Sequence, residues 1–188
     1  LPSYDNYETS GALGDPGKPG LTVVALGDSS ITAPGVNQVD DAWVRKVAHA
    51  LTDRYFVHLR AVAVGGSKAS DVLADQLGPA LKLNADLAIV SVAANDAIRG
   101  VPVKRFEQVL EDIVEKVGLG GTILSTTVES AIAKLDGPFD IIFIDPPYAH
   151  DDRTVGAVLE RAEPLLAIDG LVVLHRQAAS EVLVPEFL

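Results

Sequence analysis

The chain alternates between short, uninterrupted apolar runs and longer stretches in which apolar residues recur every three or four positions. A short apolar run that is bounded by polar or turn residues predicts a strand buried in a sheet. The clearest example is Asp140-Ile141-Ile142-Phe143-Ile144-Asp145, in which an acidic residue stands at each end. The strands that we expect lie at residues 22–26, 57–64, 87–92, 122–126, 140–145 and 170–175.

The stretches between these strands have the spacing of amphipathic helices. From Phe106 to Val117 the apolar residues share one face of a helix, whereas Lys104, Glu107 and Glu115 face water. The same spacing predicts further helices over residues 43–51, 127–135 and 155–166.

Regular alternation of strands and helices predicts an α/β doubly wound fold. We expect a mostly parallel sheet with helices on both faces, a three-layer α/β/α arrangement of the flavodoxin-like or Rossmann-like type. Functional residues in such sheets lie at the carboxyl ends of the strands. Residues 1–20 are rich in Gly and Pro and show no periodicity, so we interpret them as an arm outside this pattern.

Composition limits the classes of partner. The formal net charge of −11 argues against nucleic acid, because attraction to phosphates needs clustered Lys and Arg. The absence of cysteine excludes disulfides and thiolate metal sites, and we expect no metal. No apolar run is long enough to span a membrane.

The compartment stays open. The amino end lacks the charged-then-apolar pattern of a signal peptide, so we take the cytoplasm as the default, although a signal or anchor removed upstream would leave no trace. Methionine is absent, including at position 1, which indicates a fragment, a processed form or an engineered sequence.

The segment after strand 22–26 has the residues of a nucleophilic turn. Gly27-Asp28-Ser29 would place Ser29 above the sheet, where Gly27 leaves room and backbone amides could face a developing oxyanion. An Asp or Ser after a strand is also a common helix cap, so this segment alone leaves both interpretations open.

Polar groups also follow the next two strands. Val64-Gly65-Gly66-Ser67 ends one strand and Val92-Ala93-Ala94-Asn95-Asp96 ends the other. The Gly66 amide and the Asn95 side-chain amide are suitable donors to the oxyanion of acyl transfer. Gly66 as a simple turn and Asn95 as a helix cap are the structural alternatives.

Three segments together resemble a known family. Ala25-Leu26-Gly27-Asp28-Ser29-Ser30, Gly66 with Ala69-Ser70-Asp71-Val72-Leu73, and Ser91-Val92-Ala93-Ala94-Asn95-Asp96 resemble, in order and spacing, the first three blocks of the actinobacterial-type SGNH (GDSL) hydrolases. The resemblance covers about residues 21–118. It implies an esterase or acyl hydrolase that acts on a small-molecule ester without a cofactor. It also implies that Ser29 is the nucleophile and that the Ser29 amide, Gly66 and Asn95 form the oxyanion hole.

The chain departs from this family at two points. Ala93 stands where the third block usually begins with Gly, and the final Asp-x-x-His block is missing. Because a serine hydroxyl without a base is a poor nucleophile, we expect impaired turnover. His175, which ends the last expected strand, is our candidate base, and His150 is the other; we interpret His49 and His58 as surface or packing residues.

The carboxyl third has a different resemblance. Asp145-Pro146-Pro147-Tyr148 follows the apolar strand 140–145 and resembles the active-site tetrapeptide of bacterial 16S ribosomal RNA guanine-N2 methyltransferases. In such a site Asp145 and the Pro146 carbonyl hold an exocyclic amine, while Tyr148 stacks on a flipped base. The resemblance implies S-adenosylmethionine as cofactor, but the family's Gly-rich cofactor turn is not recognisable. A strand that simply ends at a double proline is the structural alternative.

The two resemblances suggest a chimera joined near residues 116–118. We expect an arm over 1–20, a hydrolase-like part over 21–118 and a methyltransferase-like part over 119–188, with the last two sharing one core and forming a hybrid sheet. We rank an impaired SGNH-type esterase first. An rRNA methyltransferase fragment that uses S-adenosylmethionine, and a folded but inactive chimera, are the alternatives.

Overall fold

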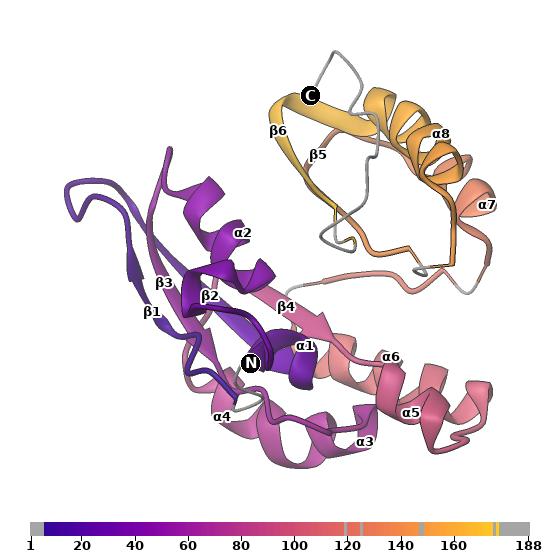
Figure 1. The fold of residues 1–188 in the computed structure, drawn as a ribbon, viewed down its shortest axis with the longest axis horizontal. Helices are drawn as coiled ribbons and strands as arrows, with labels where there is room; N and C mark the ends of the chain where they lie inside the picture. The colour runs from indigo at the N-terminus through magenta and orange to yellow at the C-terminus, as the bar shows by residue number, and fades with distance from the viewer. Residues whose placement is uncertain (1–5, 119, 125, 147–148, 175, 177–188) are drawn as a thin grey trace. The chain divides into compact units, whose positions relative to one another are not determined.

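The computed structural model describes residues 6–118, 120–124, 126–146, 149–174 and 176 (Figure 1). Contacts between Cα atoms divide the chain into two compact units, Leu1–Ile123 and Leu124–Leu188.

The first unit contains a four-stranded mixed sheet. Its strands are β1 (Gly11–Leu13), β2 (Gly20–Gly27), β3 (Phe56–Ala61) and β4 (Leu87–Ser91), in the order β1-β3-β2-β4. Its helices are α1 (Ser29–Thr32), α2 (Trp43–Leu51), α3 (Ala69–Asp71), α4 (Leu77–Leu81), α5 (Ala94–Ile98) and α6 (Val103–Val117). A 3-10 turn at Val39–Asp41 precedes α2, and a π-helical turn at Val72–Gln76 joins α3 to α4. β2 runs parallel to β3 and β4, whereas β1 runs antiparallel to β3.

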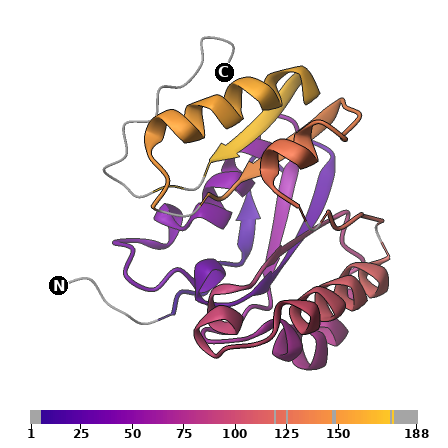
Figure 2. The ribbon, with the colours of Figure 1, turned by 90° about the vertical axis from the view of Figure 1, so that its right-hand side faces the viewer.

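Strand β2 is the centre of this unit because both of its faces are buried. Val24 and Leu26 pack into one apolar cluster with Val72 of the π-helical turn and Ile113 of α6. Successive side chains of a strand point to opposite faces, so Val23 and Ala25 face the other side, which Figure 2 shows to be the side of α2. Each fully buried Leu or Ile contributes about 1.5–3 kcal/mol. The predicted three-layer α/β architecture is therefore confirmed, with a mixed sheet.

The amino-terminal arm is partly built into this sheet. Ala12 pairs with His58 and Leu13 with Val57, and Leu13 is buried. Short, Gly-flanked segments carry little periodicity, which is why the sequence pattern did not predict β1.

The second unit contains a two-stranded parallel sheet. It consists of α7 (Val128–Ile132), β5 (Phe139–Ile144), α8 (Asp152–Ala162), a 3-10 turn at Glu163–Leu165 and β6 (Leu166–Leu174). α8 connects the two strands and buries Val155, Leu159 and Ala162. The described part of this unit thus forms a βαβ motif preceded by a short helix.

Two expectations about the strands are wrong for the described residues. No strand forms over residues 120–124, where Gly118, Gly120 and Gly121 all have positive φ. Glycine in such conformations interrupts an extended chain. The described strands also form two sheets rather than one hybrid sheet, because β2 lies in the four-stranded sheet and β5 in the two-stranded one. Whether the two units share a core stays a prediction.

Candidate active site

Ser29 lies at the start of α1, directly after the central strand. Asp28 caps this helix: its carboxylate Oδ1 accepts a hydrogen bond from the Ser30 amide at 2.9 Å, and Asp28 is buried. The capping role therefore belongs to Asp28. In the part of the chain that the structure describes, the half-buried Ser29 hydroxyl makes no side-chain hydrogen bond.

Gly27 makes the turn at the end of β2 possible. Its φ is +147°, and a methyl group at this position would overlap the Ser91 carbonyl of β4. The Asp28 amide donates to that same carbonyl at 3.2 Å. Only glycine allows β2 to stay this close to β4 while the chain turns toward Ser29.

Gly66 lies in the loop after β3, at the same edge of the sheet. Its φ of +83° again suits glycine. The neighbouring Ser67 is buried, and its amide donates to the Val64 carbonyl at 3.2 Å. The Val64 amide in turn donates to the Gly27 carbonyl at 3.1 Å, so this loop begins against the end of β2.

Asn95 of α5 joins these two segments. Its Nδ2 donates to Asp28 Oδ2 at 3.0 Å and to the Ser67 carbonyl at 3.1 Å. The structure thus brings together the segments that carry Ser29, Gly66 and Asn95. Since the Asn95 amide has two hydrogens and both are engaged, it must exchange one partner before it can donate to a substrate oxygen.

Other carboxylates near these loops act as structural supports. Buried Asp96 accepts a hydrogen bond from the Ala69 amide at 2.9 Å. The Lys68 amide donates to Asp71 at 2.9 Å, and this hydrogen bond, together with the Lys68 ammonium, lowers the pKa of Asp71. Both groups fix the start of α3.

Ala93 stands at the turn before α5, where the resembled family usually has Gly. Its φ is +138°, a region that residues with a Cβ rarely adopt. The chain keeps the turn before α5 in spite of the methyl group, at the expense of backbone strain.

Gln76 belongs to this region and was not predicted. It is buried at 2% exposure, on the π-helical turn, and contacts both Gly27 and Ser67. The signal in the sequence was a polar residue on an apolar helical face, between Val72 and Ala80.

The histidines of the first unit are engaged elsewhere. His49 lies 3.5 Å from the Asp40 carboxylate, and the His58 ring packs edge-on against Phe56 with centroids 4.6 Å apart. His150 lies in the second unit. His175, the candidate base, lies outside the described residues.

The Asp145 segment lines a pocket within the second unit. The pocket has a volume of about 470 Å³, and Asp145 and Pro146 contribute to it with Phe143, His150 and Val155. Its edge also carries Glu129, whose pKa is lowered by hydrogen bonds from its own backbone amide and from Thr127. Pro147 and Tyr148 lie outside the described residues.

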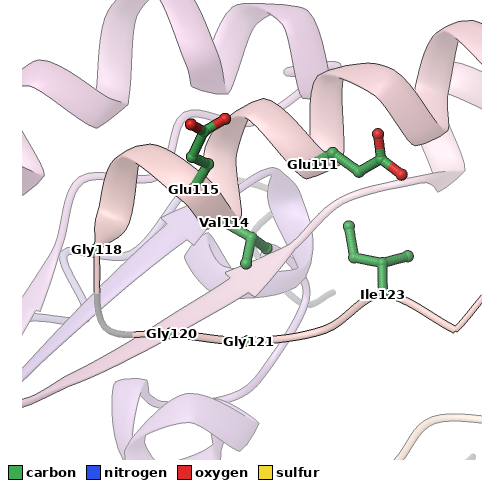
Figure 3. A pocket seen from close by; sticks show the side chains of 7 residues that line it. All are labelled: Glu111, Val114, Glu115, Gly118, Gly120, Gly121 and Ile123. Atoms are coloured by element: carbon green, nitrogen blue, oxygen red, sulfur yellow. The ribbon is translucent and has the colours of Figure 1, made fainter.

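Another pocket, of about 480 Å³, lies at the end of α6 (Figure 3). Figure 3 shows that Glu111, Val114 and Glu115 come from the helix and Ile123 from the segment that follows it. The described residues that line this pocket include no Ser, Thr, Cys or His, so they offer no nucleophile with a histidine base for acyl transfer. Among the described residues, no group of three or more His, Cys, Asp or Glu side chains is arranged to hold a metal ion, and no helix is long and apolar enough to cross a membrane.

A three-layer α/β fold with a serine turn, a glycine loop and an asparagine at successive strand ends is an architecture suited to acyl transfer. The family model of the GDSL-like lipase/acylhydrolase family matches residues 25–166, and the chain belongs to that family. The match continues well beyond the expected junction near Gly118. Nothing in it supports a methyltransferase-like part or a chimera.

Several solved structures are similar to this chain. TesA is 19% identical, with 80% of this chain and 76% of TesA covered and a TM-score of 0.50. The esterase EstA from Pseudoalteromonas sp. is 18% identical, with 82% and 76% covered and a TM-score of 0.46. AlinE4, an SGNH-hydrolase family esterase, is 20% identical, with 86% and 77% covered and a TM-score of 0.48. No curated protein sequence matches the chain significantly.

Hydrolases of this family typically need no cofactor, in agreement with the expectation from the sequence. Membership of this family is consistent with the expectation that the substrate is a small-molecule ester.

Proposed function

We propose that this protein is an SGNH-type serine esterase of small-molecule esters, with Ser29 as the nucleophile. The observation that carries this proposal is the bridge made by Asn95, which links Asp28 to Ser67 and so gathers the three segments at one edge of the sheet. The donors to the oxyanion are the amides of Ser29 and Gly66 and the Nδ2 of Asn95.

The chemistry follows from these positions. Ser29 Oγ attacks the ester carbonyl carbon and loses its proton to a base, and the carbonyl oxygen becomes an oxyanion. An oxyanion is a stronger acceptor than the Ser67 carbonyl, so Asn95 exchanges that hydrogen bond for one to the substrate. Collapse of the tetrahedral intermediate expels the alcohol, and water then hydrolyses the acyl-enzyme.

The base is the incomplete part of this proposal. His175 is the first candidate and His150 the second, and no histidine has an acidic residue three positions before it. Loss of the acid that orients the histidine of a triad lowers kcat on the order of 10⁴-fold. We therefore expect slow turnover.

Hydrolysis of p-nitrophenyl acetate tests the proposal. We expect slow turnover that Ser29→Ala abolishes and His175→Ala reduces. Ser30→Ala is the matched control, because Ser30 is the adjacent serine and its hydroxyl is engaged with Ser91 Oγ at 2.7 Å. The proposal fails if Ser29→Ala hydrolyses the ester as fast as the unchanged protein. Labelling by an organophosphonate and peptide mass spectrometry would show which serine reacts.

A methyltransferase fragment remains the second candidate, since Asp145 and Pro146 line a pocket. Under that alternative S-adenosylmethionine binds and Tyr148 stacks on the base. Titration calorimetry with S-adenosylmethionine separates the candidates, and we expect no heat of binding. Absence of both binding and Ser29-dependent turnover would leave the third alternative, a folded inactive protein.

A further inference from the structure

The buried side chain of Gln76 makes the same pair of hydrogen bonds to Gly27 that a neighbouring strand would make. The Gly27 amide donates to Gln76 Oε1 at 2.8 Å, and Gln76 Nε2 donates to the Gly27 carbonyl at 2.9 Å. Both backbone groups of the residue that precedes Asp28 are therefore held by one carboxamide.

The second hydrogen of Gln76 Nε2 reaches the other loop. It donates to Ser67 Oγ at 3.1 Å, and the Ser67 carbonyl accepts from Asn95 Nδ2. Asn95 Nδ2 also donates to Asp28 Oδ2, and Asp28 is joined to Gly27 by the peptide bond. Gln76, Ser67, Asn95, Asp28 and Gly27 thus form a closed ring, and we call it the Gln76 ring.

The Gln76 ring passes next to each group of the proposed oxyanion hole. Ser29 follows Asp28 in the chain, Gly66 precedes Ser67, and Asn95 is itself a member. Gln76 reaches the ring from the π-helical turn Val72–Gln76, and such turns often occur at functional sites.

We propose that Gln76 is a positioning residue, which acts through Gly27 and Ser67 to hold the amides of Ser29 and Gly66 and the side chain of Asn95 in register. This inference rests on the proposed esterase function as far as rate is concerned. The ring itself makes a structural claim that does not depend on turnover. A leucine of similar volume would keep the packing but remove two donors and one acceptor.

The first test measures hydrogen exchange in ¹⁵N-labelled protein by NMR. In Gln76→Leu we expect faster exchange of the Gly27 amide and also of the Asn95 side-chain amide, whose own hydrogen bonds go to Asp28 and Ser67. Gln108→Leu is the matched control, because Gln108 lies exposed on α6. An unchanged Asn95 amide in Gln76→Leu overturns the inference, whether or not ester hydrolysis is observed.

The second test uses kinetics. If the unchanged protein shows Ser29-dependent turnover, Gln76→Leu should lower kcat on the order of 10- to 100-fold, with little change in KM. The reason is that misplaced donors weaken the binding of the transition state and leave the binding of the substrate unchanged. Retention of kcat overturns the positioning role. If the protein has no Ser29-dependent turnover but Asn95 exchange responds to Gln76→Leu, the proposed function fails and the ring stands.

Gln76→Glu keeps the experiment decisive should the leucine variant not fold. A protonated glutamic acid retains the acceptor for the Gly27 amide and one donor, whereas the ionised form retains no donor. Exchange of the Asn95 amide and, where present, kcat should therefore approach the values of the unchanged protein as the pH is lowered. A pH dependence identical to that of the unchanged protein contradicts the inference.

Discussion

Backbone conformation restricts which residues the three site segments accept. Gly27, Gly66 and Ala93 all have positive φ; Gly27 ends β2, Gly66 lies in the loop after β3, and Ala93 follows β4. Two of the three positions carry the residue that suits this region, and the third does not. We therefore expect that replacing Gly27 destabilises the protein, whereas replacing Ala93 with glycine stabilises it.

Gly27→Ala should destabilise the protein strongly. The new methyl group would meet the Ser91 carbonyl, and a residue with a Cβ is strained at a φ of +147°. We expect a loss of at least about 3 kcal/mol in the free energy of unfolding, measured by urea denaturation. Gly20→Ala is the control on the same strand, since nothing lies within 4 Å of a Cβ there. Equal effects of the two substitutions would show that the close approach to Ser91 is not limiting.

Ala93→Gly should stabilise the protein. Glycine relieves the strain of a φ of +138°, and part of the gain is offset by its greater freedom in the unfolded chain. We expect a net gain of about 1 kcal/mol, which raises Tm by roughly 2–4 °C in a chain of this size. A lower Tm would mean that the methyl group contributes packing that outweighs the strain.

The elements show what a sequence pattern can and cannot specify. The apolar periodicity from Phe106 to Val117 predicted α6, because a helix that covers a sheet needs one apolar face. Caps are less predictable from a pattern: Thr127 caps α7 through its side chain, whereas Ala42, which precedes α2, makes no side-chain cap hydrogen bond. Local side-chain hydrogen bonds can be made from neighbouring positions with nearly equal ease. In the site, the strand-end motifs indicated which segments meet, but the partners of Gln76 depend on tertiary contacts.

α6 should depend on the residue at its centre. Ile113 is fully buried against β2 and the π-helical turn, so Ile113→Ala leaves a cavity. We expect a loss of about 2–5 kcal/mol in chemical denaturation. Ile98→Ala is the control, because Ile98 is 82% exposed and a change within about 0.5 kcal/mol is expected there.

The start of α8 should be sensitive to acid. The Thr154 amide donates to the Asp151 carboxylate at 2.7 Å, and this bond, with the Thr154 hydroxyl, lowers the pKa of Asp151 below 3.8. A lowered pKa means that the stabilisation is present above the ordinary pKa and is lost as the pH falls through the folded value. Asp151→Asn keeps an acceptor but cannot titrate. The stability difference between the two proteins should therefore shrink as the pH drops below 3.8, and a difference that does not change with pH contradicts this assignment.

At the scale of the whole molecule, the family match and the division into units give different boundaries. The match over residues 25–166 is continuous, whereas the contacts separate Leu1–Ile123 from Leu124–Leu188. The number of sheets and units could not be predicted from the sequence, because buried strands have the same apolar pattern whether they belong to one sheet or to two. The resemblance of the Asp145 segment to a methyltransferase covers one strand end and its neighbouring elements, and such elements occur in proteins of unrelated function.

The described residues of the second unit bury too little apolar surface for an independent domain, so the prediction of a core shared by both units stands. Among its described residues, the buried apolar side chains are Val155, Leu159 and Ala162, all from α8, and no residue of β5 or β6 is fully buried. A two-stranded sheet is marginally stable by itself. Calorimetry should therefore show one cooperative transition, and Ile113→Ala and Leu159→Ala should each lower the temperature of that same transition. Two transitions that respond separately to the two substitutions would instead establish independent cores.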